Sequence, residues 1–434
     1  MTTVTKTKRN YYIVFLIMLT FFVISFLTNI IGPLVPDIIK GFHLSLTLVA
    51  VLPFAFFIAY GVTSIPAGML NEKYKEKKIM VAAFVVSFIG ALLLALYPNY
   101  LTAVVSLFLI GCGMAMLQVV INPLLRTSGG EEHYAFNSVL AQLIFGAASF
   151  ISPLVYSYLV VNLANTTNED PVQQIFSSVV PADLPWISLY WLFALVSLAM
   201  IVVILVSRFP KVILTKDEKA GALKVHLDLL KKPTVLLFFV GIFCYVGTEQ
   251  GTANWISQFL FEYHRYDPQT TGAKAVAYFW GLMTAGGVLG LLLLKIMDSG
   301  KVLIIFTVLA ILSLSVALFT NDAKTALYAF PMVGFFASVM YPLMFSLALN
   351  SVEEHHGAFS GILLTGIIGA AVIPLIIGAI GDHWGLRTGM LFLYLTLGYV
   401  LSVGFWAKPI IKNKTIRMQK AERKRLNAKK RKMP

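Results

Sequence analysis

Long apolar segments, separated by short polar ones, run through most of the sequence. Each apolar run continues for about twenty residues, the length of a helix that crosses a bilayer. Transmembrane β-strands would instead alternate apolar and polar residues over about ten positions. The pattern predicts an all-α membrane protein with roughly twelve transmembrane helices. The predicted spans are 11–36, 45–70, 79–97, 101–125, 134–161, 186–207, 233–262, 272–296, 302–320, 324–350, 358–381 and 388–407.

One polar, lysine-rich segment divides these spans six and six. We therefore predict an N-terminal six-helix bundle (1–207), a cytoplasmic linker (208–232), a C-terminal six-helix bundle (233–407) and a basic cytoplasmic tail (408–434). The first apolar run is not closed by a small-residue cleavage site, so we expect a retained span rather than a removed signal peptide.

Composition and charge agree with a membrane protein. Hydrophobic residues make up 58% of the chain and charged residues 12%, whereas soluble domains carry about 25% charged residues. The net charge of +14 comes from basic residues between spans and at the ends, as topology signals do, so we expect no nucleic-acid partner. Their distribution predicts a multi-pass protein of the cytoplasmic (inner) membrane with both termini cytoplasmic. The basic tail either only sets this topology, the reading we favour, or also binds anionic lipid or another acidic partner.

The cysteines and histidines give little sign of metal or redox chemistry. Cys112 and Cys244 lie in apolar runs without paired spacing, so we expect no disulfide framework and no metal site. His355 and His356 stand beside two glutamates in a predicted loop. Metal binding there is an alternative to the favoured reading of a solvated loop.

An internal repeat links the two bundles. The fifth span begins AFNSVLAQLIFGAA at Ala135, and the eleventh begins AFSGILLTGIIGAA at Ala358. Both continue to a Pro-Leu pair, at Pro153 and Pro374. Two parallel six-helix halves are typical of a large class of secondary transporters, whose sites lie near mid-membrane between the halves. The repeat therefore predicts pseudo-symmetric bundles with a central site.

The seventh span carries an unusually polar stretch, YVGTEQGTANWISQFL, at 245–260. Glu249 is the only acid placed well inside any predicted span. An ionised carboxylate at bilayer depth costs at least about 2.5–3.5 kcal/mol, so it should face a protein interior or a wet cavity. Gln250, Asn254 and Gln258 recur every four residues and share one helical face. We expect this stretch to form a wall of a polar binding site.

Other spans contribute further amides and aromatic rings at matching depth. Sugars are recognised by amides and carboxylates paired to hydroxyls, with aromatic faces against the apolar side of the ring. Each amide could instead only join helices, and each ring could only pack, but the size of the set favours binding. The candidate substrate-binding residues are Asn29, Gln118, Asn122, Gln142, Gln250, Asn254, Trp255, Gln258, Trp280 and Tyr341.

Several motifs carry a family resemblance. In the loop after the second span, Gly68, Leu70, Glu72 and Lys73 resemble the Gly-x-Leu-x-Asp-Arg signature of the major facilitator superfamily. The fourth-span run GCGMAMLQVVINPLL, together with YVGTEQG and SVMYPLMFSLAL, resembles the fucose–galactose–glucose symporter family within it. The resemblance implies twelve helices in two bundles and cation-coupled sugar uptake by alternating access. It also implies a conformational gating role for Gly68, Glu72 and Lys73.

The chain departs from this family at the acidic positions that are the candidates for binding the coupled proton. Fucose-type members carry acids in the first and fourth spans, where this sequence has Asn29 and Gln118, and amides cannot titrate. Glu249 is then the candidate coupling residue, as a proton carrier or as a sodium ligand together with Thr248 and Thr252. Hard cations prefer oxygen ligands, and we favour sodium slightly.

These observations predict a monomeric secondary transporter that imports a monosaccharide or sugar derivative. No P-loop and no Asp/His/Cys constellation occur in the sequence, so we expect neither an enzyme nor a bound cofactor beyond a coupling sodium ion or proton. The expected partners are the sugar and the lipid bilayer. The alternatives are a transporter of drugs or other small polar solutes, or a membrane receptor that does not transport.

Overall fold

A computed structural model describes residues 10–408, apart from 131–133, 165–170, 211–222 and 353–355. In this part of the chain, eleven helical segments are long and apolar enough to cross a membrane. The helix α12 (Ala273–Leu293) adds a further 21-residue apolar segment, whose only charged residue is Lys274. It corresponds to the eighth predicted span, so the predicted all-α membrane fold with roughly twelve spans is confirmed.

The N-terminal half contains the six predicted spans and one short helix. Its helices are α1 (Tyr11–Thr28), α2 (Ile31–Phe42), α3 (Leu46–Tyr74), α4 (Glu76–Leu96), α5 (Tyr100–Gly129), α6 (Tyr134–Ala164), α7 (Pro171–Ser177) and α8 (Ser188–Val206). Within the predicted linker lies α9 (Leu223–Leu230), which packs against the C-terminal half.

The C-terminal half repeats this arrangement with more interruptions. Besides α12, its helices are α10 (Pro233–Ala253), α11 (Ile256–His264), α13 (Ser299–Phe319), α14 (Ala323–Ala337), α15 (Met340–Leu349), α16 (His356–Thr365), α17 (Gly369–Trp384), α18 (Leu386–Met390) and α19 (Phe392–Trp406). The boundaries predicted for the four parts of the chain stay a prediction, since the tail beyond residue 408 lies outside the described residues.

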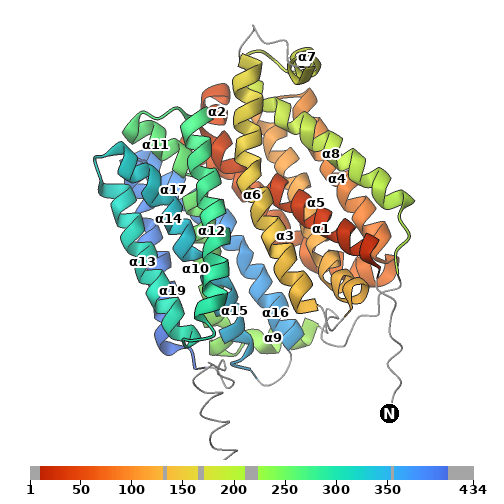
Figure 1. The fold of residues 1–434 in the computed structure, drawn as a ribbon, viewed down its shortest axis with the longest axis vertical. Helices are drawn as coiled ribbons and strands as arrows, with labels where there is room; N and C mark the ends of the chain where they lie inside the picture. Colours follow the sequence, from red (N-terminus) through yellow and green to blue (C-terminus); the bar gives the residue numbers. More distant parts are fainter. Residues whose placement is uncertain (1–9, 131–133, 165–170, 211–222, 353–355, 409–434) are drawn as a thin grey trace, which may run out of the picture.

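The halves stand side by side and meet along two related pairs of helices (Figure 1). In one pair α6 packs along α12, and in the other α17 packs along α3. Since α6 and α17 are the fifth and eleventh spans, both pairs use the segments of the predicted repeat. Gly378 on α17 shows how closely the backbones approach, because a Cβ there would lie 2.6 Å from the carbonyl oxygen of Leu46. Only glycine fits such a crossing without a shift.

Polar contacts join the halves at the end of the molecule that carries α7, which we call the α7 end (top of Figure 1). The carboxylate of Asp382, from α17, accepts the backbone N–H groups of Leu46 (2.8 Å) and Thr47 (2.9 Å) at the start of α3. These N–H groups have no partner within α3, and the helix dipole favours a negative charge beside them. At the same end, Gln269 of the C-terminal half donates to Asp37 of α2 (3.1 Å).

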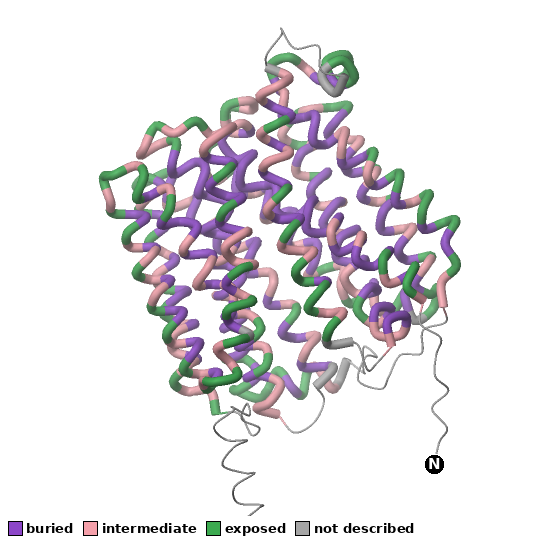
Figure 2. The backbone as a smooth tube through the Cα atoms, viewed as in Figure 1, coloured by how far each residue is buried: buried purple, intermediate pink, exposed green. Residues whose placement is uncertain are grey.

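The opposite end, which carries α9, is more open along the inner face of α5. Met114, Gln118 and Asn122 recur every four residues and therefore share that face. Met114 is buried, Gln118 is half-buried and Asn122 is exposed, so solvent exposure rises towards the α9 end. Buried residues concentrate instead where the halves meet in the upper part of the molecule (Figure 2). The halves are thus closed against each other at the α7 end.

The Asp382 contact leads to a testable prediction. In Asp382→Asn the amide is neutral, and its NH2 group would face the N–H of Thr47 instead of accepting from it. We expect the α7 ends of the two halves to separate more often. Spin labels at Tyr97 and Phe319, which are exposed at this end, should then show a longer distance population.

The matched control is Asp322→Asn. Asp322 lies at the same end and accepts the N–H of Thr325 in its own half (2.9 Å). The Asp322→Asn variant should leave the distribution of distances between the two spin labels unchanged. An unchanged distribution in Asp382→Asn as well would contradict the role given to this contact.

Candidate functional site

The first and seventh spans are both broken at an asparagine. Asn29 ends α1 just before α2 begins, and Asn254 ends α10 just before α11 begins. These spans occupy corresponding positions in the two halves. Broken helices in transporters release backbone groups at mid-membrane and commonly border the substrate site. The breaks therefore locate the candidate site between the halves.

Asn29 and Gln250 connect the halves directly at this level. The Nε2 group of Gln250 donates to Oδ1 of Asn29 across 3.4 Å, and both side chains are buried. Asn29 also donates through Nδ2 to the Ser149 hydroxyl on α6, at 2.9 Å. The structure thus brings two of the predicted substrate-binding residues together in one hydrogen-bonded group.

Glu249 continues this group into the C-terminal half. Its carboxyl group contacts the hydroxyl of Tyr245 and the amide of Gln250. The ring of Tyr245 lies against that of Tyr341, with centroids 6.0 Å apart. The Glu249 carboxyl group, the Gln250 amide and the ring of Tyr245 therefore lie close together, with the predicted Tyr341 packed against Tyr245.

Thr248, Thr252 and Trp255 are directed elsewhere. The hydroxyl of Thr248 lies 2.6 Å from that of Thr396 on α19, and Thr252 donates to the carbonyl of Thr248 (2.8 Å). The indole N–H of Trp255 donates to the carbonyl of Pro374 on α17 (3.3 Å). None of these three contacts is made with Glu249, Gln250 or Tyr245, so they do not join these residues to the group around Glu249.

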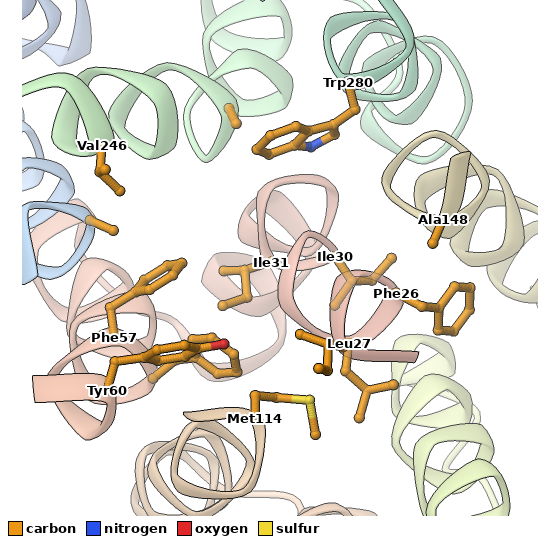
Figure 3. Close-up of a cluster of buried hydrophobic side chains, with 14 of the residues drawn as sticks. Phe26, Leu27, Ile30, Ile31, Phe57, Tyr60, Met114, Ala148, Val246 and Trp280 are labelled. Carbon is orange, nitrogen blue, oxygen red and sulfur yellow. The ribbon is translucent and has the colours of Figure 1, made fainter. Parts of the chain in front are cut away.

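Three other predicted residues have buried polar atoms without a protein partner. They are Nδ2 of Asn254, Oε1 of Gln258 and Nε1 of Trp280. Asn254 lies beside α2, where a Cβ on Gly32 would be 3.3 Å from its Cα. Figure 3 shows the ring of Trp280 directed towards Ile30 and Ile31 between the halves. Such atoms are expected to bind water or a ligand group, because an unpaired buried polar atom is costly.

The remaining predicted binding residues lie nearer the α9 end. Gln118 is half-buried, whereas Asn122 and Gln142 are exposed. Asn122 donates to the carbonyl of Gln118 at 3.4 Å. These three amides stand outside the hydrogen-bonded group and border the more open side of the molecule.

The predicted gating residues lie at the end of α3. A Cβ on Gly68 would be 3.9 Å from Val119 on α5, an ordinary contact. The ammonium of Lys73 lies 5.2 Å from the ring centroid of Tyr74. The side chain of Glu72 lies outside the described part of the structure, so the gating role stays a prediction. No metal-binding group occurs among the described residues, which do not include His355 or the side chain of His356.

Sequence reasoning missed several residues of this site. Tyr245 precedes Glu249 by four residues, and Ser25 precedes Asn29 by four, so both pairs share a helical face. That spacing was a usable signal. No comparable signal marked Ser149, whose position depends on how α6 packs against α1.

Comparisons with known proteins identify the family. The sequence profile described as Major Facilitator Superfamily matches residues 17–367. This protein belongs to the Major Facilitator Superfamily, as the sequence predicted.

Two relatives and one solved structure extend this result. The chain is 29% identical over 414 residues to the glucose/galactose transporter of Brucella abortus biovar 1 (strain 9-941), covering 93% of this chain and 96% of the relative. It is 25% identical over 398 residues to the L-fucose-proton symporter of Escherichia coli (strain K12), covering 87% and 89%. These names agree with the predicted fucose–galactose–glucose family and with a transporter rather than an enzyme.

The solved structure is a bacterial homolog of the human lysosomal transporter Spinster in an inward-facing, unoccupied conformation. It superposes with a TM-score of 0.75 at 15% identity, covering 92% of this chain and 96% of that chain. The likeness shows that the fold is shared.

The contribution of the Thr248–Thr396 contact to stability can be tested by measuring the free energy of unfolding of variants. Removing either hydroxyl should lower the free energy of unfolding by about 1 kcal/mol, because a buried hydrogen bond between membrane helices is lost. Thr248→Val, Thr396→Val and the double variant should be compared by thermal unfolding in detergent. The double variant should lose clearly less than the sum of the two single losses. Strict additivity would show that the two hydroxyls do not stabilise each other.

Proposed function

We propose that this protein imports a monosaccharide or a close sugar derivative by alternating access, coupled to a cation. The observation that carries the proposal is the hydrogen bond between Asn29 and Gln250, which joins the halves where the first and seventh spans break, with the carboxyl group of Glu249 beside Gln250. Amides and a carboxyl group with aromatic rings beside them suit the hydroxyls and apolar faces of a sugar. The names of the two relatives support the same substrate class.

The transport cycle follows from the contacts between the halves. The α7 end is closed by the contacts of Asp37 and Asp382, while the inner face of α5 is more open at the α9 end. A sugar held between the halves would pass to the other side once the α7 end opens and the α9 end closes. In this cycle the same amides meet the sugar from both sides, because the site stays fixed while the halves rock.

The charge pattern supports a cytoplasmic location for the α9 end. Asn10 directly precedes the first span and Lys408 closely follows the last span. Both of these residues lie at the α9 end. We propose an inner-membrane protein with cytoplasmic termini that imports as a monomer. The closed α7 end then faces outwards.

Glu249 is the proposed coupling residue. The sequence favoured sodium slightly, on the assumption that Thr248 and Thr252 would supply further oxygens. Their hydroxyls are engaged within the C-terminal half, which supports a proton more than a sodium ion. The proton in the name of the Escherichia coli relative favours the same carrier.

Substrate class is tested by ligand-induced stabilisation of the purified protein. We expect D-glucose, D-galactose or L-fucose to raise the apparent melting temperature, because a ligand at one hundred times its Kd adds about 2.7 kcal/mol to native stability. L-Glucose is the control for nonspecific sugar effects. Asn29→Ala should remove the shift. Stabilisation by apolar organic cations and not by sugars would favour the drug-transporter alternative.

The coupling of sugar uptake to a cation is tested in proteoliposomes, with a pH gradient and a sodium gradient imposed separately. We expect sugar accumulation to follow an imposed pH gradient without sodium. Glu249→Gln should abolish accumulation but keep sugar exchange, since the amide can still bind hydroxyls but cannot carry a proton. Accumulation that requires a sodium gradient and ignores pH would contradict proton coupling. Exchange without accumulation under either gradient would mean that the protein is a facilitator.

A further inference from the structure

Two serine hydroxyls beside Asn29 have a fixed distribution of protons. Oγ of Ser25 lies 2.6 Å from the carbonyl oxygen of Phe145 and 2.6 Å from Oγ of Ser149. Two oxygen atoms this close need a proton between them. The carbonyl has none to give, so Ser25 donates to Phe145. Ser25 has only one proton, so the second short contact takes its proton from Ser149.

This distribution decides how the Asn29 amide is turned. Ser149 gives its only proton to Ser25 (2.6 Å), which is closer than its other possible acceptor, the carbonyl oxygen of Phe145 (3.1 Å), so it can only accept from Asn29. The side-chain atom of Asn29 that lies 2.9 Å from Ser149 is therefore the NH2 group, and the same group lies 3.4 Å from Ser25. The carbonyl oxygen must then point the other way, towards Gln250 of the opposite half. All four side chains are buried, so no bulk water competes for these bonds.

The carboxyl group of Glu249, in the opposite half, is a second acceptor beside the Gln250 amide. The NH2 group of Gln250 donates to Oδ1 of Asn29, and the Gln250 amide also contacts the Glu249 carboxyl group. One amide nitrogen carries two protons, so it can satisfy both acceptors. When Gln250 moves aside, an acceptor from each half needs a new donor.

We propose that Ser25 and Ser149 are positioning residues that hold Asn29 as a hydrogen-bond acceptor, and that two neighbouring hydroxyls of the substrate replace the Gln250 amide. One hydroxyl donates to Oδ1 of Asn29 and the other to the carboxyl group of Glu249. A vicinal diol thereby bridges the halves. This inference rests on the proposed sugar transport and narrows its substrate to compounds with such a pair of hydroxyls.

The variant that tests the positioning role is Ser149→Ala. It leaves Ser25 bonded to Phe145 but removes the closer acceptor of the Asn29 amide, which can then turn. We expect the KM for D-glucose or D-galactose uptake to rise roughly tenfold, the factor that about 1.4 kcal/mol represents, with little change in maximal rate. Ser149→Thr restores a hydroxyl and should recover most of the affinity.

The matched control is Ser152→Ala on the same helix. Ser152 is equally buried and donates to the carbonyl of Phe26 on α1 (2.8 Å), so it joins the same two helices without contacting Asn29. It should leave KM unchanged. Thermal unfolding of all three variants identifies any that do not fold. If Ser149→Ala does not fold, Ser25→Ala, which removes the hydroxyl to which Ser149 donates, takes its place and should raise KM in the same way.

Sugars that lack a single hydroxyl identify which substrate hydroxyl binds Asn29. For the analogue that lacks the hydroxyl bound by Asn29, Ser149→Ala should cause no additional loss of affinity, whereas the other monodeoxy analogues should lose about tenfold, as the parent sugar does. Equal losses for every analogue, or an equal effect of Ser152→Ala, would overturn the positioning role while leaving sugar transport intact. If the wild type binds none of these sugars, the proposed function fails, and this inference with it.

Discussion

A bilayer core offers no water to an unpaired polar group, so every deep polar side chain must find its partner within the protein. Most hydroxyls in this protein solve the problem locally, as Thr20, Thr28 and Thr307 do by donating to carbonyls one turn back in their own helices. Asn29 and Gln250 are different, because each depends on a group from the other half. Separation of the halves therefore exposes a need for hydrogen bonds that a polyhydroxyl substrate can meet.

The same requirement explains how the halves fit together. Where they meet through backbone, as at Gly378 and Leu46, a small residue removes the side chain from the crossing. Where they meet through polar groups, as at Asp37 and Asp382, neutral donors satisfy each carboxylate. Close packing makes the interface specific, whereas the hydrogen bonds at the α7 end are ones that water can replace.

The sequence predicted the fold well because continuous hydrophobicity and span length are local properties. It also named Asn29 and Gln250 as substrate-binding candidates and Glu249 as a coupling candidate, since buried amides and a single deep acid are visible without coordinates. It could not separate Thr248 from Glu249, because adjacent residues on a helix point about 100° apart and only packing shows which face meets α19. Ser149 was missed for a related reason, since its role arises from the contact of α6 with α1.

The contact between Asp382 and α3 has a consequence for how this surface tolerates substitution. Two of its donors are main-chain amides, which every residue except proline supplies. Most replacements of Leu46 would therefore preserve that half of the contact, whereas replacement of Asp382 removes all of it. These hydrogen bonds thus constrain the residue type only at position 382, while packing of the Leu46 side chain against the core limits substitution at position 46. A library of random variants should retain other apolar residues at position 46 but lose proline there, and should lose most replacements of Asp382.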